Sequence, residues 1–197
     1  MVLAANTKLQ QGKYRIVTVL GQGGFGISYL AENVMLGTQV AVKEFFMKEY
    51  CDRDRNTSAV TTGSIGSRDI VDKFKLKFMR EAKMIASMNN PHIVRILDIF
   101  EENGTAYYVM EYVEKESLAE LVQKQGCLSE PVAIRYILQV AKALGYIHQQ
   151  KMNHLDIKPS NIMLNEWDQA LLIDFGVSKQ YDAVTGGQTS TTPVGIS

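Results

Sequence analysis

The stretch HLDIKPSN, residues 154–161, is the most specific part of this sequence. It places Asp156, Lys158 and Asn161 within one short polar segment. Before it, Ser129 followed by Glu130-Pro131 is a helix start signal, and the predicted helix runs to about residue 148. After it, short strands are predicted at residues 162–164 and 170–173. The polar segment is therefore predicted to connect a helix to a pair of strands.

The composition predicts a folded chain without a global charge. The chain has 197 residues, of which 46% are hydrophobic, and its 21 basic residues balance its 21 acidic residues. No overall field therefore favours nucleic acid or an anionic membrane. Cys51 and Cys127 lack the spacing of a disulfide framework or a zinc site, so a reducing cytoplasm is the expected location. No secretory leader is expected, and no stretch approaches the roughly 20 apolar residues of a membrane span.

The first half of the chain is rich in predicted strands. β-Branched and aromatic residues predict strands at residues 13–20, 27–32, 38–45, 94–100 and 105–110. Residues 47–67 mix charges with Thr, Ser and Gly, and they are predicted to form a loop. Helical spacing at residues 69–88 places Glu81 on an apolar stripe, where a carboxylate needs a cationic partner.

The second half is predicted to be mainly helical. Ser117 and Glu120 have the spacing of a capping box, which predicts a helix start ahead of the helix that precedes HLDIKPSN. A strand-rich half followed by a helix-rich half predicts two lobes, with a hinge near Glu111 to Glu114.

A glycine-rich turn joins the first two predicted strands. Gly21, Gly23 and Gly26 form G-x-G-x-x-G, and such glycines, with Gly24 beside them, let backbone approach phosphate oxygens. The dinucleotide-binding interpretation needs these glycines to open a helix, whereas a strand follows here. A phosphate loop and an ordinary glycine hairpin both remain open on this motif alone.

Lys43 strengthens the phosphate-binding interpretation. Period-two alternation puts Ala41 and Lys43 on one face of their strand, so an adenine site and a phosphate site can lie along it. An ion pair with Glu81 would hold Lys43 extended. A solvated Lys43 and a Glu81 without a functional partner would each be a credible alternative alone, but the two together are less well explained in this way.

Taken together, these motifs resemble the catalytic domain of eukaryotic-like, bacterial-type serine/threonine protein kinases. The resemblance implies that Asp156 is the catalytic base, that Lys158 approaches the transferred phosphate, and that Asn161 binds metal. It also makes Asp174 of Asp174-Phe175-Gly176 the second metal ligand. Glu111 to Val113 resemble the hinge whose backbone pairs with adenine, and Met110 before them matches the position that limits the pocket behind it.

The resemblance implies an α+β, bilobal fold. Residues 1–110 would form an antiparallel N-lobe sheet with one helix and an insertion at 47–68, residues 111–115 the hinge, and residues 116–197 an incomplete, mainly helical C-lobe. The implied reaction transfers the γ-phosphate of ATP, with Mg²⁺ or Mn²⁺, to Ser and Thr hydroxyls of proteins. A nucleotide-binding or pseudokinase module and a small-molecule phosphotransferase are the alternatives.

Three positions depart from the family pattern. Leu155 replaces the arginine that docks a phosphorylated activation loop, Ser28 replaces a valine of the glycine motif, and the interval from Lys43 to Glu81 is unusually long. None of these departures removes a catalytic group. The sequence is expected to end inside the activation segment, which would leave an apolar face of the helix before HLDIKPSN uncovered.

Overall fold

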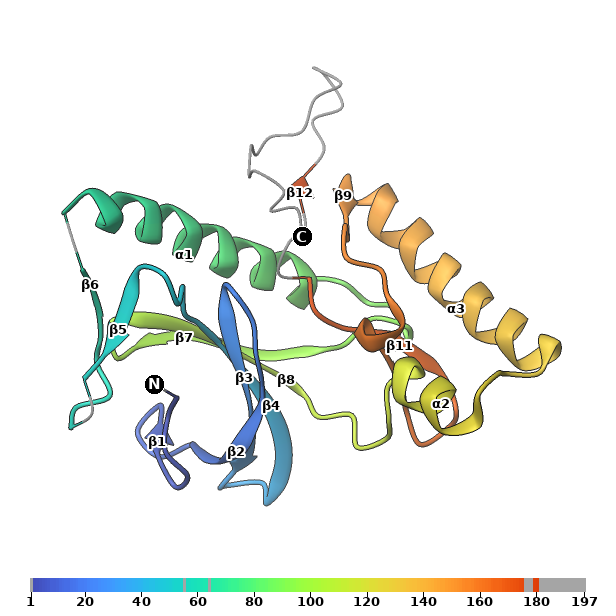
Figure 1. Ribbon diagram of the computed structural model, residues 1–197, viewed down its shortest axis with the longest axis horizontal. Helices are drawn as coiled ribbons and strands as arrows, with labels where there is room; N and C mark the ends of the chain where they lie inside the picture. Colours follow the sequence, from blue (N-terminus) through green and yellow to red (C-terminus); the bar gives the residue numbers. More distant parts are fainter. Residues whose placement is uncertain (1, 55, 64, 176–178, 181–197) are drawn as a thin grey trace. The chain divides into compact units, whose positions relative to one another are not determined.

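The computed structural model describes residues 2–54, 56–63, 65–175 and 179–180 (Figure 1). The predicted activation segment beyond Phe175 lies almost entirely outside these residues. The chain forms two compact units. Unit 1 comprises residues 1–88 and 95–112, and unit 2 comprises residues 89–94 and 113–197. The division after residue 112 falls inside the range predicted as the hinge.

Unit 1 is built on a curled antiparallel sheet with the strand order β1-β2-β3-β4-β8-β7 (Figure 1). The strands of this sheet are β1 (Lys8–Leu9), β2 (Tyr14–Gln22), β3 (Gly26–Asn33), β4 (Thr38–Phe45), β7 (Ile96–Glu102) and β8 (Thr105–Glu111). A single helix, α1 (Ile65–Ala86), contacts β7 and β8. The predicted N-lobe strands and their antiparallel pairing are confirmed.

The helix α1 covers the face of the sheet that carries Lys43. The ring of Phe78 from α1 stacks on Tyr108 with 4.9 Å between centroids and lies 5.7 Å from Phe45. Tyr108 is the cross-strand neighbour of Lys43, and directly opposite residues share a face. Because α1 packs here through aromatic rings, it places its buried side chains on the same face of the sheet as Lys43.

The prediction of a structureless loop at residues 47–67 was wrong. Cys51–Arg53 (β5) pairs antiparallel with Val60–Thr62 (β6) in a short hairpin, and α1 begins at Ile65, earlier than predicted. Cys51 and Arg53 are buried while Asp52 is exposed, which is the alternation of a strand. The mixed charges concealed this pattern because Arg53 is a buried cation.

Unit 2 contains two helices and short paired strands. Its elements are α2 (Leu118–Gln125), α3 (Glu130–Gln149), β9 (Met152–Asn153), the 3-10 turn η1 (Pro159–Asn161), β10 (Ile162–Leu164), β11 (Ala170–Leu172) and β12 (Lys179–Gln180). The predicted capping box of Ser117 and Glu120 is present at α2. The uncovered apolar face expected on α3 is also present, since Ile134, Ile137 and Leu138 are at least half exposed. Within the described ranges, no helix is both long enough and apolar enough to cross a bilayer.

Residues 89–94, predicted as part of the first lobe, belong to unit 2. Ile93 forms a bridge with Leu172, and the Leu172 N–H donates to the His92 carbonyl over 2.8 Å. The His92 ring nitrogen Nδ1 also lies 3.0 Å from the Ala170 carbonyl oxygen. These bonds attach the segment to β11, so the chain joins the second unit before returning to the sheet.

We predict that Gly104→Ala destabilises the protein by about 1–3 kcal/mol. Gly104 has a φ of +72°, and a Cβ there would lie 2.7 Å from the carbonyl oxygen of Val60 in β6. Gly37→Ala is the matched control, because Gly37 has a similar φ of +65° and no neighbour within 4 Å. Thermal unfolding should show a larger loss for Gly104→Ala. Equal losses would mean that the contact with the hairpin adds nothing.

Candidate functional site

The glycine turn joins β2 to β3, and Gly26 at the start of β3 pairs with Phe45 of β4. Within the turn, the Gly23 N–H donates to the Gly26 carbonyl over 2.9 Å. A Cβ at Gly26 would lie 2.7 Å from the Glu44 carbonyl oxygen, so glycine is needed there for strand packing. At Gly21 and Gly24 a Cβ would have no neighbour within 4 Å. These two positions leave open space along the backbone, which a phosphate-binding turn needs.

The strand β4 places Ala41 and Lys43 beside the glycine turn. Ala41 lies between Leu30 of β3 and Met110 of β8, and Lys43 lies opposite Ser28. The Lys43 Cε atom is 3.7 Å from the position of a Cβ on Gly26. The structure thus brings together, in unit 1, the predicted adenine-facing alanine, the predicted phosphate-binding lysine and the glycines.

Glu81 is the buried carboxylate of α1. Its side chain is 12% exposed, and its Oε1 lies 3.6 Å from Lys77 Nζ. This distance is too long for a hydrogen bond, and Oε1 has no hydrogen-bond partner in the described part of the chain. Burial raises the pKa of Glu81 to about 7, against the opposing positive charges of Lys77 and Lys43. The direct contact between Lys43 and Glu81 stays a prediction.

The polar segment of unit 2 gathers Asp156, Lys158 and Asn161. The Asn161 amide Nδ2 donates to Asp156 Oδ2 over 2.8 Å and to the Asp156 backbone carbonyl over 2.9 Å. Lys158 Nζ lies 2.8 Å from the same Oδ2 atom. Asn161 is only 5% exposed, so it is a fixed support for the half-exposed aspartate. The three residues of HLDIKPSN predicted to act together therefore form one cluster.

His154 is the buried residue that holds this segment in place. It is 1% exposed, its Nε2 lies 3.0 Å from the Ile173 carbonyl oxygen, and its ring lies 4.6 Å from that of Phe175. These contacts give His154 a structural, supporting role. The exposed Leu155 adopts a φ of +63°. A left-handed backbone at a residue with a large side chain is strained, and such strain concentrates at functional sites.

Asn161 and Asp174 supply oxygen atoms suited to a hard divalent cation. The side-chain nitrogen of Asn161 donates to Asp156, and its Oδ1 carbonyl oxygen is the atom that could bind a metal. The Ile173 N–H donates to the Asn161 carbonyl over 3.0 Å, so the residue before Asp174 is bonded to Asn161. In the described ranges, no three His, Cys, Asp or Glu side chains form a metal-binding group. Mg²⁺ needs only one or two protein ligands when phosphate and water supply the rest, so this pair fits it.

The predicted hinge residues end the last strand of unit 1. Glu111 is tied to Arg95 twice: its N–H donates to the Arg95 carbonyl over 3.1 Å, and its Oε1 accepts the Arg95 N–H over 2.9 Å. Val113 is the first residue of the chain's return to unit 2. The side chain of Glu111 therefore supports the edge of the strand, and the backbone of the hinge stays the predicted adenine contact.

Sequence reasoning missed one polar cluster on the other face of β4. Glu44 is fully buried there, beside Arg53, Tyr29 and Tyr107. The signal was available: the alternation that puts Lys43 on one face puts Glu44 on the face of Val40 and Val42, where a charge needs a partner.

Comparison with known proteins gives consistent similarities. The protein kinase domain family model matches residues 14–195. The chain is 32% identical over 180 residues to serine/threonine-protein kinase PrkC of Bacillus subtilis, covering 91% of this chain and 25% of that protein. It is 34% identical over 189 residues to serine/threonine-protein kinase B of Synechocystis, covering 94% of this chain and 30% of that protein. A solved structure titled PpkA-294 apo form is similar with a TM-score of 0.80 and 27% identity, over 89% of this chain and 62% of that one.

We predict that Glu81→Gln removes a pH dependence of stability. The unfolded carboxyl releases its proton near pH 4.5, whereas the folded one holds it to about pH 7. Unfolding in this window releases a proton, so stability falls as pH rises through it, by roughly 3 kcal/mol in total. Urea unfolding at several pH values measures the slope. The exposed Asp72 of the same helix gives the control Asp72→Asn, which should keep the slope. A slope that survives Glu81→Gln would contradict the assignment.

Proposed function

Because the chain belongs to the protein kinase domain family, we propose that its protein transfers the γ-phosphoryl group of ATP to serine and threonine hydroxyls of protein substrates. The observation that carries the proposal is the cluster of Asp156, Lys158 and Asn161, in which one carboxylate oxygen receives both supporting contacts. The chain spans about a quarter of the length of the PrkC relative. The activity, substrates and partners of the whole protein therefore belong to the proposal.

Asp156 is the proposed base. Asn161 and Lys158 both contact its Oδ2 atom and so fix the plane of the carboxylate. The other oxygen, Oδ1, is the one proposed to accept the proton. The substrate hydroxyl donates its proton to Asp156, and the hydroxyl oxygen forms the new bond to the γ-phosphorus. The bond between the γ-phosphorus and the oxygen that bridges it to the β-phosphate breaks, and ADP leaves. Little covalent chemistry falls to the protein, so the position of this carboxylate is its main contribution.

Lys158 favours serine and threonine over tyrosine as substrates. Its ammonium group is half exposed and lies beside the proposed base, so it can contact the phosphoryl group as charge moves onto it. The resemblance of HLDIKPSN to serine/threonine kinases and the printed names of the relatives support the same substrate class.

ATP is the proposed phosphoryl donor. Gly21 and Gly24 leave open space along the backbone for the phosphates, Lys43 offers a cation, and Ala41 with the backbone of Glu111 and Val113 would receive adenine. Asn161 and Asp174 would hold Mg²⁺, for which Mn²⁺ can substitute. The metal supplies neutralisation of phosphate charge when bound. Two free cysteines and a net charge of zero support a cytoplasmic location without nucleic-acid partners.

We predict that Asp156→Asn lowers turnover by about 10²-fold or more while the affinity for Mg-ATP stays within about twofold of wild type. The reason is that Asp156 acts on the substrate hydroxyl and not on the nucleotide. The measurement is steady-state phosphorylation of a protein substrate, with calorimetry for nucleotide binding, in the protein at its full natural length.

Lys43→Met is the matched control for this experiment. It removes the cation of the nucleotide site, so it should abolish stabilisation by Mg-ATP in a thermal melt. Unchanged turnover in Asp156→Asn would exclude the proposed base. Unchanged nucleotide binding in Lys43→Met would mean that ATP binds elsewhere, and nucleotide binding without any transfer in wild type would favour a pseudokinase module.

A further inference from the structure

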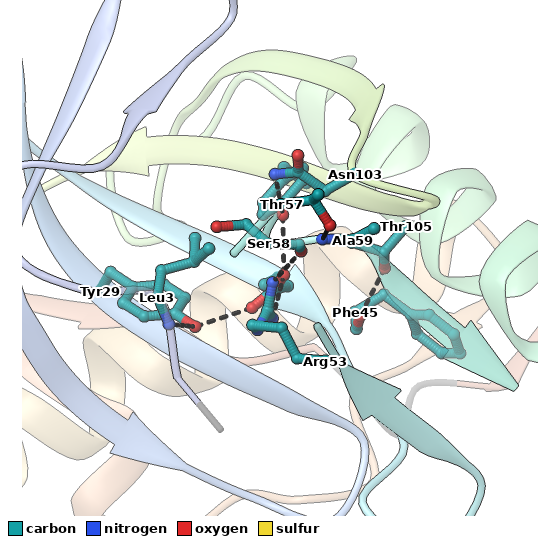
Figure 2. A network of polar contacts seen from close by, with 11 residues as sticks. Leu3, Tyr29, Phe45, Arg53, Thr57, Ser58, Ala59, Asn103 and Thr105 are labelled. Carbon is teal, nitrogen blue, oxygen red and sulfur yellow. Dashed lines mark hydrogen bonds and ion pairs between the residues drawn. The ribbon is translucent and has the colours of Figure 1, made fainter. Parts of the chain in front are cut away.

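A buried ion pair joins the hairpin of β5 and β6 to the sheet (Figure 2). Arg53 Nη2 lies 2.6 Å from Glu44 Oε1, and the two side chains are 4% and 0% exposed. The guanidinium carbon also lies 5.3 Å from the centre of the Phe46 ring. Removing two opposite charges from water is repaid only where geometry is good and the remaining polar atoms are satisfied. The contacts of Glu44 meet that condition.

Both oxygens of Glu44 accept a tyrosine hydroxyl. Tyr29 Oη donates to Oε2 and Tyr107 Oη donates to Oε1, each over 2.7 Å. Burial, assisted by the negative charge of Glu44, raises the pKa of both tyrosines, so they keep their protons and act as donors. Tyr29 also accepts the Leu3 N–H over 3.2 Å. Glu44 thus connects three strands of the sheet, the hairpin and the N-terminal segment.

The contacts of the hairpin form a closed ring. Arg53 Nη1 donates to the Ser58 carbonyl over 2.9 Å (Figure 2). Two residues later, the Val60 N–H donates to the Asn103 carbonyl over 2.7 Å. Asn103 Nδ2 in turn donates to Tyr107 Oη over 3.1 Å, which returns to Glu44. The ring consists of hydrogen bonds and is closed by the ion pair between Arg53 and Glu44, so it constrains the orientation of the hairpin as well as its proximity to the sheet.

The ring lies close in the chain to both residues that are proposed to position ATP, Lys43 and Glu81. Glu44 follows Lys43 directly on β4, so a shift of this carboxylate moves the backbone that carries the lysine. At the other end, β6 ends at Thr62 and α1, which carries Glu81, begins at Ile65. The hairpin and α1 also line a common pocket of about 280 Å³, to which Val60 and Thr62 contribute from the hairpin and Val71 and Lys75 from α1.

We propose that Arg53 is a positioning residue for ATP binding: its ion pair with Glu44 holds the hairpin on the sheet, and the hairpin sets where α1 presents Glu81 to Lys43. This inference rests on the proposed function. A pair kept only for stability would be replaceable by apolar side chains, because buried ion pairs are often no more stabilising than such replacements. The ring of contacts instead fixes the hairpin, and with it the start of α1, in one orientation relative to β4.

A double-mutant cycle tests the inference in the protein at its full natural length. Glu44→Gln with Arg53→Met removes both charges and leaves no ion buried alone, and Arg53→Lys keeps the charge but loses the forked geometry. Each is made in the wild type and in Glu81→Gln, and the dissociation constant of Mg-ATP is measured by calorimetry with a thermal melt for folding. Arg15→Met, which removes the exposed pair with Glu32 on the same sheet, is the matched control.

The expected result is non-additivity. Both Arg53 variants should weaken Mg-ATP binding by about tenfold in wild type and by less than about twofold in Glu81→Gln, while Arg15→Met stays within about twofold of its parent. Equal losses in both backgrounds, binding within twofold of wild type, or failure of both variants to fold would each overturn the positioning role. The proposed function fails separately, if Glu81→Gln and Lys43→Met leave Mg-ATP affinity unchanged.

Discussion

Unit 1 depends on how a charged side chain is accommodated on each face of its central strand. β4 carries Lys43 toward the face that α1 covers and Glu44 toward the opposite face, where no water reaches the carboxylate. A buried carboxylate is tolerated only with a cation and hydrogen-bond donors around it, and Arg53, Tyr29 and Tyr107 supply them. The hairpin that brings Arg53 must therefore lie against the sheet, and the chain leaving that hairpin must enter α1. The position of Glu81 follows from this path.

The segment HLDIKPSN of unit 2 also joins a buried polar residue to exposed ones, but here the proposed functional residues are the exposed members. Asn161 is buried and donates twice to Asp156, while Asp156 itself stays half exposed and Lys158 more so. The buried member fixes the geometry and the exposed members remain available to a substrate. His154 adds a second support through Ile173 and Phe175, which ties this segment to the chain on either side of Asp174. Leu155 is accommodated at an exposed, left-handed position and takes no part in these supports.

Local sequence patterns predicted most of the fold because strand alternation, helical spacing and capping depend only on residues close together in the chain. Alternation located β4 and its two faces, helical spacing put Glu81 on the buried side of α1, and the capping box located the start of α2. The hairpin at residues 51–62 was not predicted because its strands are three residues each and its buried cation resembles a surface charge in the sequence. The attachment of residues 89–94 to β11 depends on a pairing with Leu172, far along the chain, which no local pattern encodes. The motifs predicted the Asp156 cluster, whereas the ring around Glu44 required long-range contacts.

We propose that the protein moves a phosphoryl group from ATP to serine and threonine. The most direct test of this proposal is incubation of the full-length protein with γ-labelled ATP, Mg²⁺ and a mixed protein substrate, followed by separation of the phosphorylated amino acids after acid hydrolysis. The account predicts label in phosphoserine and phosphothreonine only, and loss of the label when Mg²⁺ is chelated. Label in phosphotyrosine, or release of labelled inorganic phosphate with no label on protein, would contradict it.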